Sequence, residues 1–493
     1  MCNPAPTPAV AVSSANAERK VSGKEYDADV LAPEDAWIEK VDLEALKEDI
    51  RELGKQLAAQ QGPEDMAHLR KIISWSRACT LTGLFTMWYM VNPLSIYLIS
   101  IGTMSRWTII GHHVCHGGFD KCSSGTYSRF KFGVGSLWRR IVDWLDWMLV
   151  EAWNVEHNQL HHYCLGEATD PDLVEDNLKG IRTYKTSFPG EKYIIVAFFM
   201  ATWKWFYYAP NTFKMLKLHE MRRLGKVPMY EGKPVSERSM RRAWSLDSCY
   251  YRGNVYFTKA EMFGRVLGPY FVRQFVLLPL LFGLTLGRAA YFNSLMSMVL
   301  AEMLTNIHSF IVIVPNHTGD DLYRFDRHCT ARSATFFLRQ IISSANFSLG
   351  TDLIDFHHGW LNYQVIAPLI APDGLNYQVE STITFGLTGR CLPDCTSDCT
   401  GWPLITTLII SQVEHHLWPD LSMLSYQKAA PLVQSICRKH GVPYIKHSVF
   451  WRLKKTIDIM VGKASMRKFP SKWEVEADLT SADDVAPLHA TAH

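Results

Sequence analysis

Three short stretches of the chain place histidines at spacings that suit metal binding. These stretches are 111–116, 156–162 and 412–416. They hold eight of the 19 histidines, and imidazole is a good ligand for iron, copper, nickel and zinc. A helix brings residues three and four apart onto one face, so His112 pairs with His116 and His157 with His161. A single pair is more often a surface or capping pair, but three stretches together indicate a metal site.

The composition indicates a membrane protein with large water-facing parts. Aromatic residues make up 12% of the 493 residues and charged residues 20%, and the charges lie mostly outside a few apolar stretches. The net charge of +3 does not argue for a nucleic-acid partner. A dense basic stretch at 214–242 is either a solvated loop or, as the positive-inside rule favours, a cytoplasmic surface. The 11 cysteines form no convincing disulfide framework, which suits a reducing compartment.

Two apolar regions have the composition of membrane-spanning segments, each of which needs roughly 20 residues. Residues 78–104 carry no charge, and Asn92 and Pro93 form a turn signal at their middle. This region is therefore either one span or a tight helical hairpin. Residues 270–286 and 289–315 form a second apolar pair. We expect two hairpins.

The position of the histidines limits how the chain crosses the membrane. All three stretches must reach one site, so an even number of crossings must separate them. The Trp-rich stretch 138–153 and the stretch 193–208, which Lys204 interrupts, are therefore expected to be interfacial. The predicted fold is an all-α integral membrane protein with four transmembrane helices in two hairpins, interfacial helices and a cytosolic histidine-rich cap. The predicted organisation is an N-terminal tail and amphipathic helix at 1–74, a membrane domain at 75–455 and a C-terminal tail at 456–493.

The motifs resemble those of the membrane fatty-acid desaturases, which carry boxes of the form HxxxH, HxxHH and (H/Q)xxHH. Residues 412–419 read QVEHHLWP, which is similar to the QxEHHLFP pattern of front-end acyl desaturases. Residues 314–317 read VPNH and resemble the isolated Asn-His of that family. The resemblance covers residues 75–455 and is specific in its boxes.

Three departures from the family pattern affect the interpretation. The second box reads HxxxHH, one residue longer than usual, and this is the spacing of an alkane-hydroxylase box. The first box has His113 where the family often has Asp. The chain has no HPGG motif of a fused cytochrome b5 domain, so the expected electron donor is a separate cytochrome b5 or ferredoxin.

The resemblance implies a ligand set for two iron ions and no catalytic side chains beyond it. The implied ligands are His112, His116, His157, His161, His162, His317, His415 and His416. His113 either replaces His112 or forms a hydrogen bond outside the ligand set. Asp170 and Asp172 either orient a ligand or belong to a solvated loop. His308, on an apolar segment, is a further candidate for the surroundings of the iron.

The resemblance also implies the reaction. Two iron ions and O2 would introduce a double bond into a fatty acyl chain of a lipid or acyl-CoA. Soluble di-iron bundles use Glu-x-x-His motifs, and none of the boxes here is of that kind. A hydroxylase of lipids, alkanes or carotenoids on the same scaffold is the alternative. A non-catalytic lipid receptor is a third hypothesis. The expected partners are the acyl substrate and the membrane, with no nucleic acid. The expected location is the endoplasmic reticulum, with a plastid membrane as the alternative.

One stretch of the chain, 365–412, is predicted to be a translated intron. The family's third box usually reads GGLNYQxEHHLFP without interruption, and joining Gln364 to Val413 gives GWLNYQVEHHLWP. The codon of Val365 begins with GT and Gln412 can be encoded by CAG, as expected at the edges of an intron. The stretch also contains the unusual run Cys391, Cys395 and Cys399 and repeats the letters LNYQ at 375–378. The alternative is a genuine surface loop, since long loops cost little in closure entropy, although unstructured loops of this length are uncommon.

Overall fold

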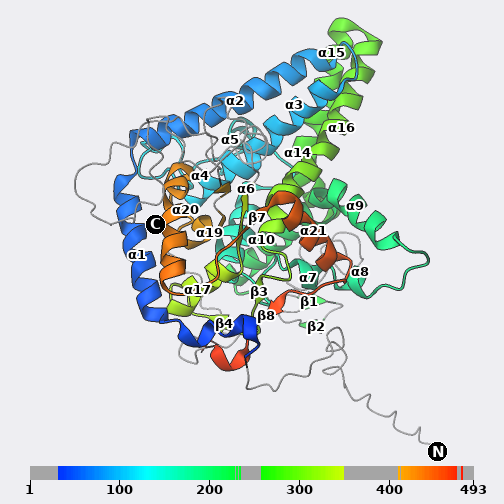
Figure 1. Ribbon diagram of the computed structural model, residues 1–493. Coiled ribbons are helices and arrows are strands. Elements are labelled where there is room, and N and C mark those ends of the chain that lie inside the picture. Colours follow the sequence, from blue (N-terminus) through cyan, green and yellow to red (C-terminus); the bar gives the residue numbers. More distant parts are fainter. Residues whose placement is uncertain are drawn as a thin grey trace, which may run out of the picture.

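The computed structural model describes residues 31–227, 229–230, 233–234, 257–348, 409–410, 412–474 and 479–480, and it is mostly helical. Two hairpins of helices project from a larger body (Figure 1). The stretch 365–411 lies outside the described residues except for 409–410, so the intron hypothesis stays a prediction.

The first hairpin consists of α2 (Pro63–Met87) and α3 (Pro93–Met104). The predicted turn lies between them, and the Asn92 side chain accepts a hydrogen bond from the Ser95 N–H at 2.8 Å, which caps α3. The two helices approach closely, as helices with small residues do. A Cβ at Gly83 would lie 2.6 Å from the Ile99 side chain. A hairpin, rather than a single span, therefore occupies 78–104.

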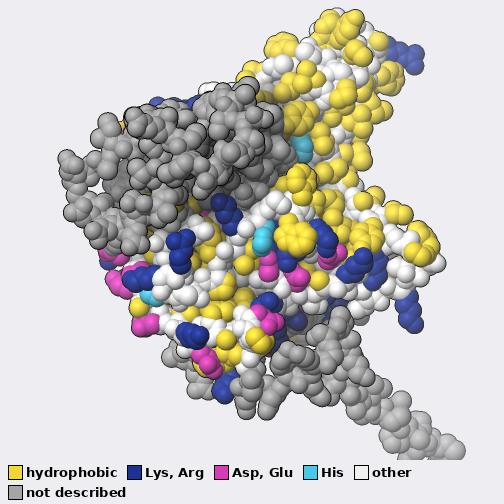
Figure 2. Space-filling model, viewed as in Figure 1, with side chains coloured by type: hydrophobic (Ala, Val, Ile, Leu, Met, Phe, Trp, Pro, Cys, Tyr) yellow, Lys and Arg dark blue, Asp and Glu magenta, His cyan; other side chains and the backbone are white. Residues whose placement is uncertain are grey.

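The second hairpin consists of α15 (Leu278–Leu286) and α16 (Arg288–Ile313), which meet at Gly287 with φ of 94°. Before α15 the helix is continuous through α13 (Lys259–Glu261), η7 (Met262–Leu267), α14 (Gly268–Phe271) and η8 (Val272–Leu277). The surface of the projecting hairpins is mainly hydrophobic (Figure 2). In the described part of the chain, two helices are long and apolar enough to cross a membrane, Lys259–Leu286 and Arg288–Asn316. These are the two arms of the second hairpin, and the count of four spans stays a prediction.

The two stretches expected at the membrane interface differ from each other. α9 (Glu191–Trp203) exposes Ile194 and Phe198 and continues through η6 (Lys204–Tyr208) into α10 (Ala209–Arg223). The stretch 138–153 is not one helix but α5 (Leu137–Asp143), an irregular segment and α6 (Val150–Trp153). The prediction for its tryptophans was wrong for three of the four, because they pack inside the main hydrophobic core. These three are Trp144, Trp147 and Trp153.

Lys204, which interrupts an otherwise apolar stretch, is fully buried in a cluster of charges. Its Nζ lies 3.0 Å from Asp146 Oδ1 and 3.6 Å from Glu302 Oε1. Trp147 Nε1 donates to Glu302 Oε1 at 2.5 Å, and the Tyr270 hydroxyl donates to Glu302 Oε2 at 2.6 Å. The cluster connects η6, the segment before the second histidine box and α16. Breaking such a buried pair is costly because one charge is left without its partner.

Replacing Lys204 by methionine is therefore expected to lower the free energy of unfolding by about 3–5 kcal/mol. The matched control is Lys55→Met, which removes a pair with Glu52 in which both side chains are more than half exposed. The control should change the free energy by less than about 1 kcal/mol. Denaturant unfolding in detergent measures both variants, and equal losses would contradict the role assigned to Lys204.

The body is completed by helices around the histidine boxes. α1 (Leu43–Gln60) packs its buried face against α17 (Ala334–Ile342) and α20 (Met423–Lys439). Gly54 is needed in α1 because a Cβ there would lie 2.3 Å from the indole of Trp418, just after the third box. The remaining longer helix is α21 (Val449–Met460). Two short helices, α7 (Val174–Asn177) and α8 (Lys179–Thr183), follow the second box.

Short strands, which the all-α prediction did not include, join these helices. β5 (Ala345–Ser348) lies between β6 (Ile409–Ile410), which is antiparallel to it, and β7 (Ile445–Ser448), which is parallel. The other pairs are β1 (Met229–Tyr230) with β2 (Lys233–Pro234), β3 (Tyr323–Arg324) with β8 (Arg467–Lys468), and β4 (His328–Cys329) with β9 (Leu479–Thr480). Met466, Phe469 and Glu474, in the expected C-terminal tail, are buried against the body.

Candidate metal centre

The first box lies at the end of a continuous helix. α3 passes through the π-helical turn η3 (Ser105–Gly111) into α4 (His112–His116). Gly117 ends the helix with φ of 89°, a left-handed conformation that glycine adopts without strain. The i, i+4 pair His112 and His116 therefore lies on helical backbone, as predicted, at the body end of the first hairpin.

The second box does not form the regular helix that its spacing suggested. The π-helical turn η4 (Asn154–Asn158) carries His157 and then ends, and the 3-10 turn η5 (His161–Tyr163) carries the other two histidines. Because the chain leaves the helix between His157 and His161, these two side chains do not have to serve the same metal. The third box lies on α19 (Gln412–Leu417), a helix of six residues.

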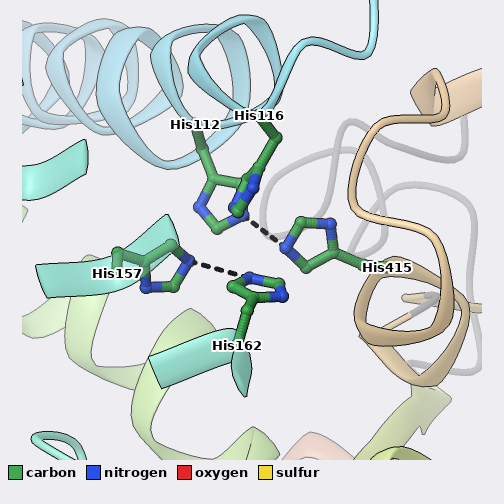
Figure 3. A group of neighbouring side chains, drawn as sticks. All are labelled: His112, His116, His157, His162 and His415. Atoms are coloured by element: carbon green, nitrogen blue, oxygen red, sulfur yellow. Dashed lines mark hydrogen bonds between the residues drawn. The ribbon is translucent and has the colours of Figure 1, made fainter. Parts of the chain in front are cut away.

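The eight histidines that the sequence singled out meet as two adjoining groups. Five of them form the group drawn in Figure 3: His112, His116, His157, His162 and His415. The other three form a second group: His161, His317 and His416. Within each group, one ring nitrogen per residue lies within 4.8 Å of the others. The groups touch where the rings of His162 and His416 stack with centroids 4.2 Å apart.

The ring nitrogens point toward one another inside each group. His112 Nε2 lies 2.7 Å from His415 Nε2, and His157 Nε2 lies 3.3 Å from His162 Nε2 (Figure 3). In the second group, His416 Nε2 lies 3.1 Å from His317 Nε2. Convergent nitrogens of this kind, contributed by distant parts of the chain, are what a shared metal ion requires.

The protonation state of these imidazoles suits a metal. Burial lowers the pKa of seven of the eight well below the ordinary value, and neighbouring imidazoles lower it further. Neutral imidazole is the form that ligates a metal. Within the two histidine groups, three buried ring nitrogens have no hydrogen-bond partner: His116 Nε2, His157 Nδ1 and His162 Nδ1. The residues present therefore fit a metal centre rich in nitrogen ligands.

Polar groups outside the two groups orient the imidazoles, as is usual for metal-binding histidines. His161 Nδ1 lies 2.9 Å from Asp170 Oδ1, and the backbone N–H groups of Gly166 and Asp172 each donate to Asp170 at 2.9 Å. Burial alone would lower the pKa of His161, but the Asp170 carboxylate, together with that of Asp172, outweighs it and raises that pKa. Asp170 therefore orients a histidine, and the interpretation of a solvated loop was wrong for it.

The other orienting groups carry no motif, and sequence reasoning missed them. His416 Nδ1 lies 3.1 Å from Gln340 Oε1, and His415 Nδ1 lies 3.3 Å from the Tyr426 hydroxyl. The backbone carbonyl of Ser343 lies 3.2 Å from His317 Nδ1. Gln340 and Ser343 lie far from every box in the sequence, and Tyr426 follows the third box by ten residues without any recognisable pattern.

Two candidates from the sequence lie outside both groups. The His113 ring packs beside His112, and its Nδ1 lies 2.7 Å from the Ile109 carbonyl oxygen within its own helix. His308 Nδ1 lies 2.9 Å from Ser100 Oγ, and the His308 ring contacts the Tyr97 ring edge-on. His308 therefore connects α16 to α3. His308 therefore belongs to the packing of the two hairpins.

We expect His113→Ala to reduce turnover much less than His116→Ala. The His113 ring is a neighbour of the five-histidine group, whereas His116 belongs to it and has its Nε2 without another partner. Rates and iron content of both purified variants test this expectation. Equal losses would show that His113, not His112, is the ligand from this part of the first box.

A separate cluster, formed by Cys164, Glu167 and His328, also offers suitable ligand types. Glu167 Oε1 accepts from Arg339 Nη1 at 3.1 Å, and Glu167 Oε2 lies 2.7 Å from His328 Nδ1. A buried guanidinium beside the carboxylate supplies the positive charge that a metal would bring. This cluster is therefore an ion-pair network that holds β4 beside the second box.

The fold and the site together define a class of protein: a helical protein with apolar hairpins and a buried centre of histidines. Comparisons with known proteins relate short stretches of the chain to fatty acid desaturases. The chain is 44% identical over 62 residues to the fatty acid desaturase 2-like protein FADS2B of Mus musculus, covering 13% of the chain and 12% of that protein. It is 26% identical over 68 residues to the acyl-lipid (8-3)-desaturase of Physcomitrium patens, covering 14% of each protein.

These matches are short, and the aligned part of the chain spans less than a sixth of the length of either relative. No protein-family model matches the chain. No solved structure matches it either. The short matches support a relationship to the fatty acid desaturases.

Proposed function

We propose that this protein is an O2-dependent di-iron desaturase that introduces a double bond into a fatty acyl chain of a lipid or acyl-CoA. The observation that carries the proposal is the convergence of eight histidines into two adjoining groups of five and three. The groups would hold one iron each. The relative from Physcomitrium patens is described as an acyl-lipid desaturase, which supports the same substrate class here.

Each part of the site has a role in this reaction. Iron, when bound, supplies with O2 the oxidising power that removes hydrogen from an unactivated alkyl chain. The histidines hold the metal, and Asp170, Gln340 and Tyr426 keep three of the rings in one orientation. The boxes are buried in the body, which keeps bulk water away from the metal ligands. A separate cytochrome b5 or ferredoxin would supply the electrons.

The proposed location is a membrane, with the endoplasmic reticulum first and a plastid membrane second. The two arms of the second hairpin support membrane insertion, because both are long and apolar enough to cross. The exposed apolar side chains of α9, including Ile194 and Phe198, suit a helix that lies in the membrane surface. The acyl chain of the substrate would then reach the site from the bilayer.

Hydroxylation of lipids, alkanes or carotenoids is the second candidate. The observation that favours it is the HxxxHH spacing of the second box, which resembles that of an alkane-hydroxylase box. Both reactions begin by removing one hydrogen from the acyl chain. Desaturation then removes a second hydrogen, whereas hydroxylation adds a hydroxyl group. Both reactions use the same ligands, so the product distinguishes them.

The test is expression of the protein in a host with a simple lipid profile, followed by mass spectrometry that locates new double bonds and hydroxyl groups. We expect new double bonds with the wild-type chain and none with a His162→Ala control expressed at the same level. Hydroxylated chains would establish the second candidate. A purified wild-type chain that binds no iron and yields neither product would refute the proposed function.

A further inference from the structure

The helix that carries the third box is capped by a residue from elsewhere in the chain. The first four N–H groups of a helix have no partner inside it, and the residue before the helix usually caps them. In α19, the N–H of Val413 donates to Asn346 Oδ1 at 2.9 Å. Asn346 lies on β5, 67 positions earlier in the sequence, and is fully buried.

Asn346 also holds the side chain of Glu414, the neighbour of His415. Asn346 Nδ2 donates to Glu414 Oε2 at 2.9 Å, and the Tyr444 hydroxyl donates to Glu414 Oε1 at 2.7 Å. Asn346 Nδ2 and the Tyr444 hydroxyl are themselves 2.5 Å apart. Three side chains therefore form a closed ring of hydrogen bonds. This ring fixes both the start of the six-residue helix and its rotation about its own axis.

The residues just before β5 also contact the three-histidine group. Ser343, three residues before Asn346, accepts from His317 Nδ1 through its backbone carbonyl. His317 Nε2 lies 3.1 Å from Nε2 of His416 on α19. The segment 343–346 therefore contacts both the loop that carries His317 and the helix that carries His416, and it sets their separation.

We propose that Asn346 is a positioning residue of the metal centre, which caps α19 and fixes its ring nitrogens relative to the other boxes. This inference rests on the proposed function, because it assumes that His415 and His416 bind metal. Groups that orient ligands typically contribute 10–100-fold to metal affinity. Asn346 is expected to contribute in that range although it touches neither histidine ring.

The first experiment measures the affinity of the purified full-length protein for ferrous iron by competition with a chelator under anaerobic conditions. Asn346→Ala should weaken the affinity about 10–100-fold and change the circular dichroism of the bound iron. Asn346→Ala loses three side-chain hydrogen bonds. The control is Asn293→Ala, which loses two, to the carbonyls of Trp88 and Tyr89 at the far end of the hairpins. The control should keep the wild-type affinity and spectrum. Tyr444→Phe, a milder change, should lie between them.

The second experiment exchanges the two groups that meet in the ring. In Asn346→Asp combined with Glu414→Gln, a carboxylate at position 346 accepts from the Val413 N–H and from the new amide at position 414. Each single substitution should weaken iron binding, and the pair should recover the affinity to within a few-fold.

Wild-type affinity and spectrum in Asn346→Ala would overturn this inference alone. So would a double variant that binds iron no better than the weaker single variant. A wild-type chain that binds no iron would overturn both this inference and the proposed function.

Discussion

Replacing His415 or His161 by alanine is expected to abolish turnover. His415 belongs to the five-histidine group, where its Nε2 lies 2.7 Å from His112 Nε2, and His161 belongs to the three-histidine group. Each substitution removes a proposed ligand and leaves its orienting partner, Tyr426 or Asp170, without a ring to hold. Loss of a ligand should cost more than the 10–100-fold typical of outer partners.

The measurement is the iron content of the purified protein together with its rate of acyl product formation. The wild-type chain should hold two iron ions, and each variant should hold fewer. A matched control is His447→Ala, because the side chain of His447 is 41% exposed and belongs to neither group. Full activity in His415→Ala or His161→Ala would refute the assignment of that residue.

Removing residues 365–412 and joining Gln364 to Val413 is expected to yield the active form of the enzyme. The eight histidines are unchanged by this deletion. The glutamine at the start of the third box is also kept, since Gln364 takes the place of Gln412, whose Nε2 lies 3.4 Å from His317 Nε2. The two residues before Gln412 that the structure describes, Ile409 and Ile410, pair with Ser348 and Phe347 of β5. The joined chain must replace this short pairing with residues before Gln364.

Two measurements test the deletion. Sequencing of the mature transcript should show the joined reading frame. At equal expression, the joined chain should form more acyl product than the full chain. A mature transcript that keeps the whole stretch, in the form that is dominant and active, would refute the intron hypothesis.

The types and positions of the histidines were the part of the site that could be predicted from the sequence. All eight fall in the two groups, although each group combines histidines from separate segments that only tertiary folding brings together. That they bind iron stays a prediction. The division into five and three could not be predicted, since it depends on where η4 ends and on how α19 faces the second box.

The fold was predictable where a short local signal determined the geometry of the backbone. Asn92 and Pro93 indicated the turn of the first hairpin, and the structure places a capped helix start there. Three of the four tryptophans of 138–153 were misplaced because an interfacial helix and a buried irregular segment share the same composition. The orienting residue Gln340 lies 76 positions before His416 in the sequence, and only tertiary packing brings the two together.

Adjacent histidines in the second and third boxes belong to different groups: His161 and His416 to one, His162 and His415 to the other. Consecutive Cα atoms are about 3.8 Å apart, and the peptide bond between them is rigid. The two halves of the centre therefore share backbone at two places and cannot relax independently. Filling one half orders the residues that form the other, so iron uptake should be cooperative, with few molecules carrying a single ion.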